Sequence, residues 1–387
     1  MSLQGVAQRA AWVEVDLEAI AHNVRTLKSV VGNAELLAVV KANAYGHGAV
    51  RVAEAALAAG AHGLAVALVQ EGIELRRAGI EAPILILSEQ PIEQVGDIVA
   101  HGLIASAYSV PFIDALETEA RRRDIVGQEV HLKIDTGMNR VGARPNQAVE
   151  LAGRIVACSP VLSLQGTFTH LAMADDLESP FTSLQVERFD SALESMRQAG
   201  IDPGWVHIAN SAGVIGHPGT HRDLVRVGIA MYGIPPDQSL VAHCRLLKPA
   251  LCLKAQVSYV KRVAAGAGIS YGQRHHFDHE TTVATVPLGY ADGVPRRLSA
   301  VGGHVLIAGR RCPIVGVVTM DQLMVDVGDM DVAPGDEVIL LGSQGEHVIS
   351  PNGWGALLGT IGYEVVCALS ARLPRRFIGG LSEESEL

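Results

Sequence analysis

Three observations on the sequence predict an α/β protein made of an N-terminal (β/α)8 TIM-type barrel and a C-terminal, mostly-β domain. Eight short apolar stretches alternate with amphipathic segments in residues 1–240. Nearly continuous apolar strands indicate a parallel sheet that is covered on both faces. From residue 241 to 387 strand patterns joined by glycine-rich turns replace the amphipathic segments. A chain of 387 residues also favours two domains over a single core.

The elements follow in order. Apolar and polar residues alternate in 12–17, which predicts a strand that can belong to the β domain. In residues 17–31 the apolar positions have the period of a helix. The eight predicted barrel strands are 37–40, 63–68, 83–87, 104–108, 130–135, 164–170, 206–211 and 224–232. Amphipathic helices predicted between them include 49–59, 68–78, 149–158 and 184–199. In the β domain, strands are predicted within 250–263, 282–287, 305–307, 314–318, 323–327 and 337–341.

Composition excludes several classes of function. The chain has 41 acidic and 31 basic residues, and a net charge of -10 disfavours nucleic acid or an anionic membrane as a partner. Its five cysteines are scattered without a CxxC pair, so we expect no disulfide framework, no metal site and a reducing compartment. Residues 1–9 lack the apolar core of a signal peptide, and no later apolar run is long enough to span a bilayer. We therefore expect a cytoplasmic enzyme.

Residues 37–48 combine a buried strand, a lysine at its end and a glycine-punctuated turn: LAVVKANAYGHG. Burial of an amine lowers its pKa and makes the neutral form available, and a neutral lysine amine can form a Schiff base. If the strand is considered alone, a simpler interpretation is that the lysine has no chemical role and only extends its charged end into solvent at the barrel rim. The following Tyr45, Gly46 and Gly48 favour the first interpretation, because glycines admit an anionic group and a phenol can donate a hydrogen bond to it.

Further polar residues stand at the ends of other predicted strands. Asp135, His170 and Ser211 occupy the same position as Lys41, and barrel enzymes place their chemistry at the carboxyl ends of the strands. Segments 208–213 and 226–233 offer a hydroxyl, small residues and backbone N–H groups where a phosphate often binds, although small residues also simply fit a barrel. In a closed barrel, the strand that ends at Lys41 lies beside the last strand, so a phosphate-bearing cofactor can span the two.

These motifs together resemble the alanine racemases, fold-type III enzymes that use pyridoxal 5'-phosphate. The resemblance covers residues 12–375 with its motifs in the expected order. It is carried by segments 37–48, 133–142, 167–172, 208–213, 226–233, 268–272, 289–293, 317–322 and 362–365. It implies a two-base interconversion of L- and D-alanine that supplies D-alanine for peptidoglycan.

The resemblance also implies a role for each candidate residue. Lys41 would carry the cofactor and serve as one base, and Tyr271 would be the base on the opposite face. A phenol has a pKa of about 10, so this second role needs a nearby cation such as Arg140. The residues implied to hold the cofactor are Lys41, Tyr45, His170, Asn210, Ser211, Arg226, Gly228, Ile229 and Tyr363. Those implied to contact substrate are Arg140, Tyr290, Met320 and Asp321, and Lys133 is a candidate for carbamylation.

Arg226 bears on the type of reaction. An arginine keeps its proton, so a pyridine nitrogen facing it accepts a hydrogen bond and makes the ring a weaker electron sink, which favours simple removal and return of a proton. An ordinary ion pair with Asp223 is the alternative for Arg226, and one between Lys133 and Asp135 is the alternative for the lysine. Taken singly, His170 and Met320 also fit core residues, and Tyr271 fits a hairpin tyrosine.

Two positions depart from the family pattern: Thr319 stands where cysteine is common, and Gly362 where asparagine is common. In the family, Tyr271 and Met320 would act on the barrel of the other subunit, which implies a homodimer with sites completed in trans. Three other functions stay open: a racemase of another small amino acid such as serine, a decarboxylase of the same architecture, and a non-catalytic vitamin-carrier barrel. Arg226 argues against the decarboxylase, and the β domain argues against the carrier.

Overall fold

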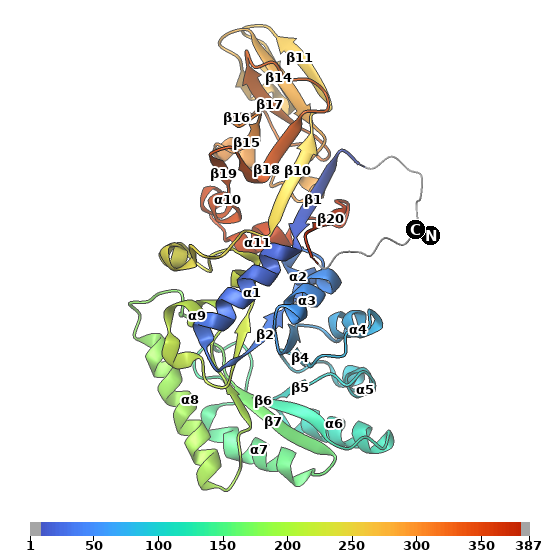
Figure 1. Ribbon diagram of the computed structural model, residues 1–387, viewed down its shortest axis with the longest axis vertical. Coiled ribbons are helices and arrows are strands. Elements are labelled where there is room, and N and C mark those ends of the chain that lie inside the picture. The colour runs from blue at the N-terminus through green and yellow to red at the C-terminus, as the bar shows by residue number, and fades with distance from the viewer. Residues whose placement is uncertain (1–8, 381–387) are drawn as a thin grey trace. The chain divides into compact units, whose positions relative to one another are not determined.

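The computed structural model describes residues 9–380, which divide into two compact units (Figure 1). The first, here called the barrel unit, comprises 19–44 and 49–248. The second, here called the β unit, comprises the described residues up to Glu18, the short segment Tyr45–Gly48, and the chain from Pro249 onward.

Eight parallel strands form the barrel unit, as the sequence predicts. They are β2 (Glu35–Val39), β3 (Gly63–Val66), β4 (Ile84–Ile86), β5 (Ala105–Ala107), β6 (Gln128–Lys133), β7 (Leu162–Phe168), β8 (Trp205–His207) and β9 (Leu224–Val227). Their order around the sheet is β4-β3-β2-β9-β8-β7-β6-β5, and a parallel bridge between Leu85 and Ile104 closes the ring from β4 to β5. The first and last barrel strands are neighbours, with Leu37 opposite Arg226. The eight-stranded barrel is therefore confirmed.

Helices alternate with these strands and lie outside them (Figure 1). They are α1 (Leu17–Val31), α3 (Ala49–Ala58), α4 (Val69–Arg77), α5 (Val95–Ala100), α6 (Val110–Arg122), α7 (Ala148–Ala157), α8 (Phe181–Gln198) and α9 (Ser211–Gly216). Each buries one face: in α3 the buried residues are Ala49, Val52, Ala53 and Ala56, the spacing that an α-helix brings to one side. The strands are buried on both faces, and all four residues of β3 are inaccessible.

The β unit is built on one mainly antiparallel sheet. Its strands are β1 (Ala11–Asp16), β10 (Leu251–Gln256), β11 (Tyr259–Val263), β14 (Thr281–Val286), β15 (His304–Ile307), β16 (Arg310–Val315), β17 (Leu323–Gly328), β18 (Glu337–Gln344), β19 (His347–Ile349) and β20 (Arg375–Ile378). A separate small hairpin pairs β12 (Gly268–Ile269) with β13 (His275–His276). The N-terminal β1 pairs with β10 and β20, so this sheet joins the two ends of the described chain.

The β unit differs from expectation in two details. The stretch 250–263 contains two strands, because the backbone leaves the first ladder at Val257 and Ser258, whose N–H groups donate to Asp336 and Thr285. Two helices that we did not predict, α10 (Pro351–Leu358) and α11 (Gly362–Cys367), follow β19. Ser350 caps the N-terminus of α10, because its hydroxyl accepts a hydrogen bond from the N–H of Gly353.

Candidate active site

Polar residues gather at the carboxyl ends of the barrel strands. Lys41 follows β2, Asp135 follows β6, His170 follows β7, and Ser211 starts α9 after β8. Because parallel strands end at the same rim, these residues face one end of the barrel.

A left-handed turn fixes the backbone after Lys41. The segment α2 (Lys41–Tyr45) contains Ala42, Asn43 and Ala44 at φ values of 52 to 53°. Left-handed conformations cost roughly 1–2 kcal/mol for each residue with a side chain, so they persist only where neighbours hold them. Here the N–H of Ala42 donates to the Glu71 carboxylate at 2.6 Å, and the Asn43 side chain accepts from the N–H of Ala49 at 2.8 Å. The carboxyl end of β2 is therefore rigid next to the lysine.

Arg226 crosses the inside of the barrel and is held by acceptors from neighbouring strands. One nitrogen, Nη1, donates to His207 at 2.8 Å, and Nη2 donates to the carbonyl of Thr169 at 2.7 Å and lies 3.3 Å from Nδ1 of His170. The carbonyl of Ile208 accepts a further bond at 3.0 Å. The alternative ion pair with Asp223 is not formed within residues 9–380, because no carboxylate contacts this guanidinium.

The rim carries an excess of positive charge. Burial, followed by the charges of Arg226, Arg140 and Lys41, lowers the pKa of Lys133 to about 7. The side-chain nitrogen of Lys133 donates a hydrogen bond to the carbonyl of Leu87 at 2.8 Å. Within residues 9–380, Lys133 does not form the alternative ion pair with Asp135. That carboxylate accepts from the N–H groups of the loop after β6 instead. Lysine and arginine side chains gathered at one rim suit anionic groups such as a phosphate or a carboxylate.

Backbone donors lie at the ends of β8 and β9. The hydroxyl of Ser211 accepts hydrogen bonds from the N–H groups of Gly228 and Ala230 at 3.0 and 3.3 Å, which ties the two strand ends together. Asn210 caps α9, because its side-chain oxygen accepts from the N–H of Gly213 at 2.9 Å. The geometry therefore gives Asn210 a role in shaping this end of the barrel.

Two donors that belong to buried residues fit a cofactor that carries a phosphate and a ring nitrogen. Arg226 and Ile229 are buried, yet within residues 9–380 neither the Nε–H of Arg226 nor the backbone N–H of Ile229 has a hydrogen-bond partner. A ring nitrogen and a phosphate oxygen are acceptors of the kind that these donors lack.

The other predicted site residues belong to the β unit. Tyr45 and Tyr363 pack with their ring centroids 6.2 Å apart. Tyr271 follows the small strand β12 and is 75% exposed, Tyr290 is 42% exposed and Met320 is 52% exposed.

Neighbouring turns support these exposed side chains. The N–H groups of Tyr290 and Ala291 donate to the carbonyls of Thr319 and Met320, and a side chain at Gly289 would lie 2.2 Å from the Met320 oxygen. Ser270 likewise donates to the carbonyl of Val317 at 3.1 Å. The turns that carry Tyr271, Tyr290 and Met320 are therefore connected by hydrogen bonds.

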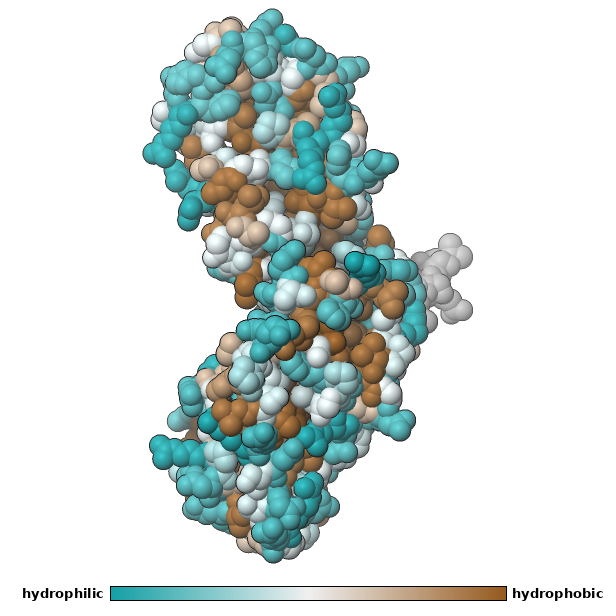
Figure 2. Space-filling view, turned by 90° about the vertical axis from the view of Figure 1, so that its left-hand side faces the viewer, coloured by the Kyte–Doolittle hydropathy of each residue, from teal (hydrophilic) through white to brown (hydrophobic). Residues whose placement is uncertain are grey.

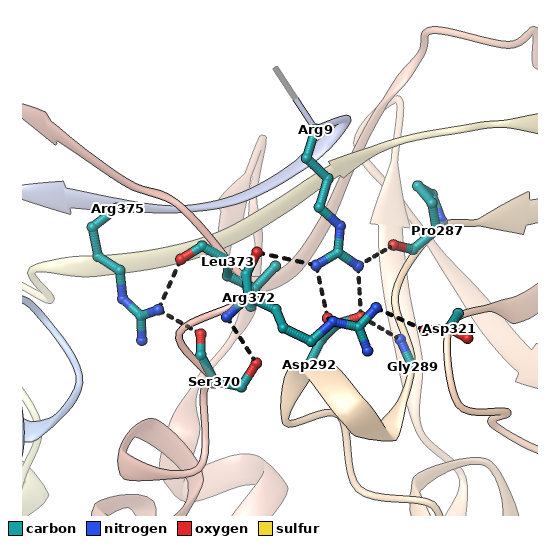
Figure 3. A network of polar contacts seen from close by, with 9 residues as sticks. All are labelled: Arg9, Pro287, Gly289, Asp292, Asp321, Ser370, Arg372, Leu373 and Arg375. Atoms are coloured by element: carbon teal, nitrogen blue, oxygen red, sulfur yellow. Dashed lines mark hydrogen bonds and ion pairs between the residues drawn. The ribbon is translucent and has the colours of Figure 1, made fainter. Parts of the chain in front are cut away.

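A chain of alternating charges connects the turns that carry Tyr290 and Met320 (Figure 3). Arg9 makes two bonds of 2.7 Å to the Asp292 carboxylate, which is fully buried. Arg372 lies 3.5 Å from the same carboxylate and donates to Asp321 at 2.7 Å. Burial alone would raise the pKa of Asp292, but the bonds from Arg9 and from the N–H of Gly289 outweigh burial and lower it.

We expect the change Asp292→Asn to lower the free energy of unfolding by about 2 kcal/mol at pH 7, because it leaves two arginines without their carboxylate. The pKa of Asp292 is lower in the folded state, so its contribution is present above the unfolded pKa of about 3.9 and is lost as the pH falls through the folded value. Urea titrations at fixed protein concentration at pH 7 and pH 3 measure both effects.

The matched control is Asp329→Asn, which removes a 94%-exposed carboxylate from its ion pair with Arg262. Its effect should be below about 0.5 kcal/mol. Equal losses in the two variants would contradict a special role for the buried carboxylate.

Comparison with known proteins places this geometry in a family. The family model described as the alanine racemase N-terminal domain matches residues 15–236, and that of the alanine racemase C-terminal domain matches residues 250–377. The chain belongs to the alanine racemase family.

Relatives agree over the full length. The alanine racemase of Symbiobacterium thermophilum is 48% identical over 98% of this chain and 99% of its own. The crystal structure of alanine racemase from Streptomyces lavendulae is 38% identical, with a TM-score of 0.92 over 97% of this chain and 99% of its own. The histidine racemase of Leuconostoc mesenteroides is 28% identical, with a TM-score of 0.89 over 97% of this chain and 99% of its own. Members of this family depend on pyridoxal 5'-phosphate.

The two departures from the alanine racemase pattern have local explanations. The hydroxyl of Thr319 donates to the carbonyl of Gln322 at 2.7 Å, so it closes the turn that carries Met320. A side chain at Gly362 would meet the side-chain oxygen of Asn352 at 2.1 Å, so Asn352 fills the space that a larger residue would need.

Sequence reasoning missed several residues of this alanine racemase site. His131 and His207 lie beside Arg226, Glu71 fixes the turn after Lys41, and Gln185 of α8 donates to Thr136 and to the carbonyl of His170. The sequence contained a signal for His131 only. It lies two positions before Lys133 on the same strand, and alternate residues of a strand share a face, so both side chains point the same way. No local pattern marks the other three.

Proposed function

We propose that this chain interconverts L- and D-alanine with Lys41 and Tyr271 as its two bases. The observation that carries the proposal is the cationic rim, where a lysine after β2 stands at the same end of the barrel as Arg226, whose Nε–H lacks an acceptor in the described structure. The family membership supplies the substrate class.

When bound, pyridoxal 5'-phosphate supplies an electron-withdrawing ring that makes the Cα–H of the amino acid more acidic. Lys41 holds the cofactor and takes or returns the proton on one face of Cα, and Tyr271 does so on the other. Two bases on opposite faces are needed because removal and return on one face would regenerate the same enantiomer. The phenol of Tyr271 is 75% exposed in one chain and is therefore accessible to a substrate.

Arg226 and His170 would set the ring chemistry. The Nε–H of Arg226 would donate to the ring nitrogen, and burial lowers the pKa of Arg226 only to about 9, so it keeps its charge at neutral pH. A ring nitrogen that accepted this bond would stay unprotonated, which would favour rapid return of the proton over reactions that need a stronger electron sink. Burial first, and then Arg226, lowers the pKa of His170 well below its ordinary value, so this histidine is neutral.

We assign the phosphate to Ser211, Gly228, Ile229, Tyr45 and Tyr363. The support is the buried N–H of Ile229, the hydroxyl that contacts the Gly228 N–H, and the packed pair of phenols. Asn210 acts through the helix that it caps. We assign the substrate carboxylate to the guanidinium of Arg140 and the backbone N–H of Met320, and the borders of the substrate site to Asp321 and Tyr290.

We further propose a homodimer in which Tyr271 and Met320 complete the site of the partner subunit. The support is the exposure of Tyr271, Tyr290 and Met320, three large side chains on turns that hydrogen bonds connect. Hydrophobic side chains are visible among polar ones on the face of the β unit in Figure 2. A second chain is the partner that gives these residues a function.

We propose that Lys133 is carbamylated. Because its pKa is about 7, a large fraction of its amine is neutral at pH 7 to 8. The amine nitrogen can attack the carbon of carbon dioxide and lose a proton, which leaves a carbamate anion among the positive charges of Arg140, Arg226 and Lys41. A cavity of about 10 Å³ lined by Lys133, Asp135, Arg140 and His170 lies beside it.

We expect ¹³C-labelled carbon dioxide to give a carbamate NMR signal that grows as the pH rises through 7 and is absent in Lys133→Met. The control is Lys254→Met: burial lowers the pKa of Lys254, but Glu14 raises it above its ordinary value overall, so that amine stays charged. A signal that persists in Lys133→Met, or that disappears in Lys254→Met, would contradict the assignment.

The reaction would supply D-alanine for peptidoglycan, and we place it in the cytoplasm. The thiols of Cys158, Cys244, Cys252 and Cys312 are free, which suits a reducing compartment. In the described residues no helix has the length and apolar character needed to cross a bilayer, and no cluster of residues suits a metal ion.

Polarimetry of each alanine enantiomer with the cofactor-loaded protein tests the proposed function. We expect equal final mixtures from both enantiomers, slower turnover of serine, and no release of carbon dioxide. Faster turnover of serine or histidine than of alanine would assign a different substrate. Release of carbon dioxide would indicate a decarboxylase. Absence of any turnover with the cofactor bound would indicate a non-catalytic carrier.

A further inference from the structure

Ser270 directly precedes Tyr271 and has a backbone conformation that serine rarely adopts. Its φ is 65° and its ψ is -175°. This is the mirror image of an extended conformation, which glycine populates about as readily as the extended one, whereas a Cβ atom makes it unfavourable for other residues. A rotation of Ser270 to a negative φ would send the chain in another direction at residue 271. The conformation of Ser270 therefore sets where Tyr271 points.

The backbone determines the direction of Tyr271, because its hydroxyl is not held by a hydrogen bond. The residue is 75% exposed, and within residues 9–380 of one chain its hydroxyl makes no hydrogen bond. On the other side of Ser270, Ile269 is buried in a cluster of apolar side chains that includes Val315. Ser270 therefore connects a strand that is anchored in the core to an exposed phenol.

Two neighbouring residues keep Ser270 in this conformation. Its hydroxyl donates to the carbonyl of Val317 at 3.1 Å. Gly316 leaves room for it, because a Cβ atom on Gly316 would lie 2.6 Å from the Cβ of Ser270, and unbonded carbon atoms prefer a separation of about 3.5–4.0 Å. Val317 lies three positions before Met320. The hydroxyl therefore also ties the turn that carries Tyr271 to the segment that leads to Met320.

We propose that Ser270 is a positioning residue that fixes the direction of Tyr271 and its place relative to the turn of Met320. The hydrogen bond to Val317 compensates for the unfavourable backbone conformation. Without the hydroxyl nothing compensates, so residue 270 populates other conformations and the phenol is less often in its working direction. The consequence for catalysis rests on the proposed function, in which Tyr271 serves one face of Cα. The face that Lys41 serves is unaffected, since Lys41 belongs to the barrel unit.

The test measures exchange of the alanine Cα–H in deuterated water for Ser270→Ala, which removes only the hydroxyl. The full-length protein is loaded with pyridoxal 5'-phosphate, and mass spectrometry follows each enantiomer before the two have mixed. The enantiomer whose exchange is lost in Tyr271→Phe is the one that Tyr271 serves. In Ser270→Ala its exchange should fall roughly tenfold or more, as expected for a displaced base, while that of the other enantiomer should stay within about twofold.

Ser270→Gly separates the conformation from the hydroxyl. Glycine populates this backbone conformation without the steric cost, so its loss should be smaller than that of Ser270→Ala and confined to the same enantiomer. The matched control is Ser258→Ala, which removes another serine hydroxyl of the β unit that donates to a backbone carbonyl, that of Thr285 at 3.0 Å. It should change neither exchange rate.

A second measurement needs no substrate. The N–H of Gln273 donates to the carbonyl of Ser270 at 3.1 Å, so its hydrogen exchange reports on this turn. It should be faster in Ser270→Ala than in Ser270→Gly, and unchanged in Ser258→Ala. If the wild type does not racemise alanine, the proposed function fails, and this order of exchange rates still supports the role of Ser270 in the turn.

Equal losses for the two enantiomers would show that Ser270 only supports the fold, and would overturn the proposal. A loss in Ser270→Gly as large as that in Ser270→Ala would also overturn it, because the strained conformation would then have no part in the effect. If Ser270→Ala does not fold, Ser270→Gly decides alone: a loss confined to the enantiomer that Tyr271 serves supports the proposal, and a loss shared by both overturns it.

Discussion

Replacing Lys41 with alanine should lower kcat/KM for alanine racemisation by roughly 1000-fold or more, since it removes both a base and the attachment of the cofactor. The rigid turn after β2 gives neighbouring residues little freedom to move into its place. Borohydride reduction of the cofactor-loaded wild type, followed by peptide mapping, should place the modification on Lys41, and the variant should show none there.

Lys248→Ala is the control for Lys41, because it also removes one lysine from the barrel unit but from an exposed position. It should retain full activity and normal labelling. Activity of Lys41→Ala within tenfold of the wild type, or labelling of Lys133 in the wild type, would disprove the assignment of Lys41.

The change Tyr271→Phe should also reduce racemisation by roughly 1000-fold, because a phenyl ring cannot carry a proton. Both directions must slow equally, since the two enantiomers have the same free energy in water. Exchange of the Cα–H with deuterated water should persist for one enantiomer only, because Lys41 still serves one face. Mass spectrometry of recovered alanine measures this exchange, and borohydride labelling of Lys41 should remain intact.

Tyr259→Phe is the matched control, because Tyr259 is also a tyrosine of the β unit and is 59% exposed. It should change neither racemisation nor exchange. Exchange that persists for both enantiomers in Tyr271→Phe would mean that another group serves the second face.

Mixing Tyr271→Phe with Lys41→Ala chains tests completion in trans. A mixed dimer would combine an intact lysine from one chain with an intact tyrosine from the other at one of its two sites. About one quarter of wild-type activity should then appear from two inactive proteins after random exchange of subunits. Failure to regain activity, although mixed dimers form, would place both bases in the same chain.

Much of the architecture could be predicted from local patterns. Short apolar runs separated by helix-period segments predicted eight parallel strands, and closure of such a barrel predicted that the lysine strand lies beside the strand of Arg226, as the pairing of Leu37 with Arg226 confirms. The ends of the predicted strands also indicated the positions of Lys41, Asp135, His170 and Ser211. These inferences succeed because each rests on a repeat within a few residues.

The sequence by itself determined the strand order, the family and the residue types available for chemistry. Only the tertiary structure decided which of them meet: the His131–His207–Arg226 contacts join three strands, and Arg9 reaches Asp292 across 283 positions. Such bonds depend on the direction of side chains after strands have paired, and a buried strand has no alternation of polar and apolar residues to reveal its inward face. The polar network around Arg226 therefore became visible only with the fold.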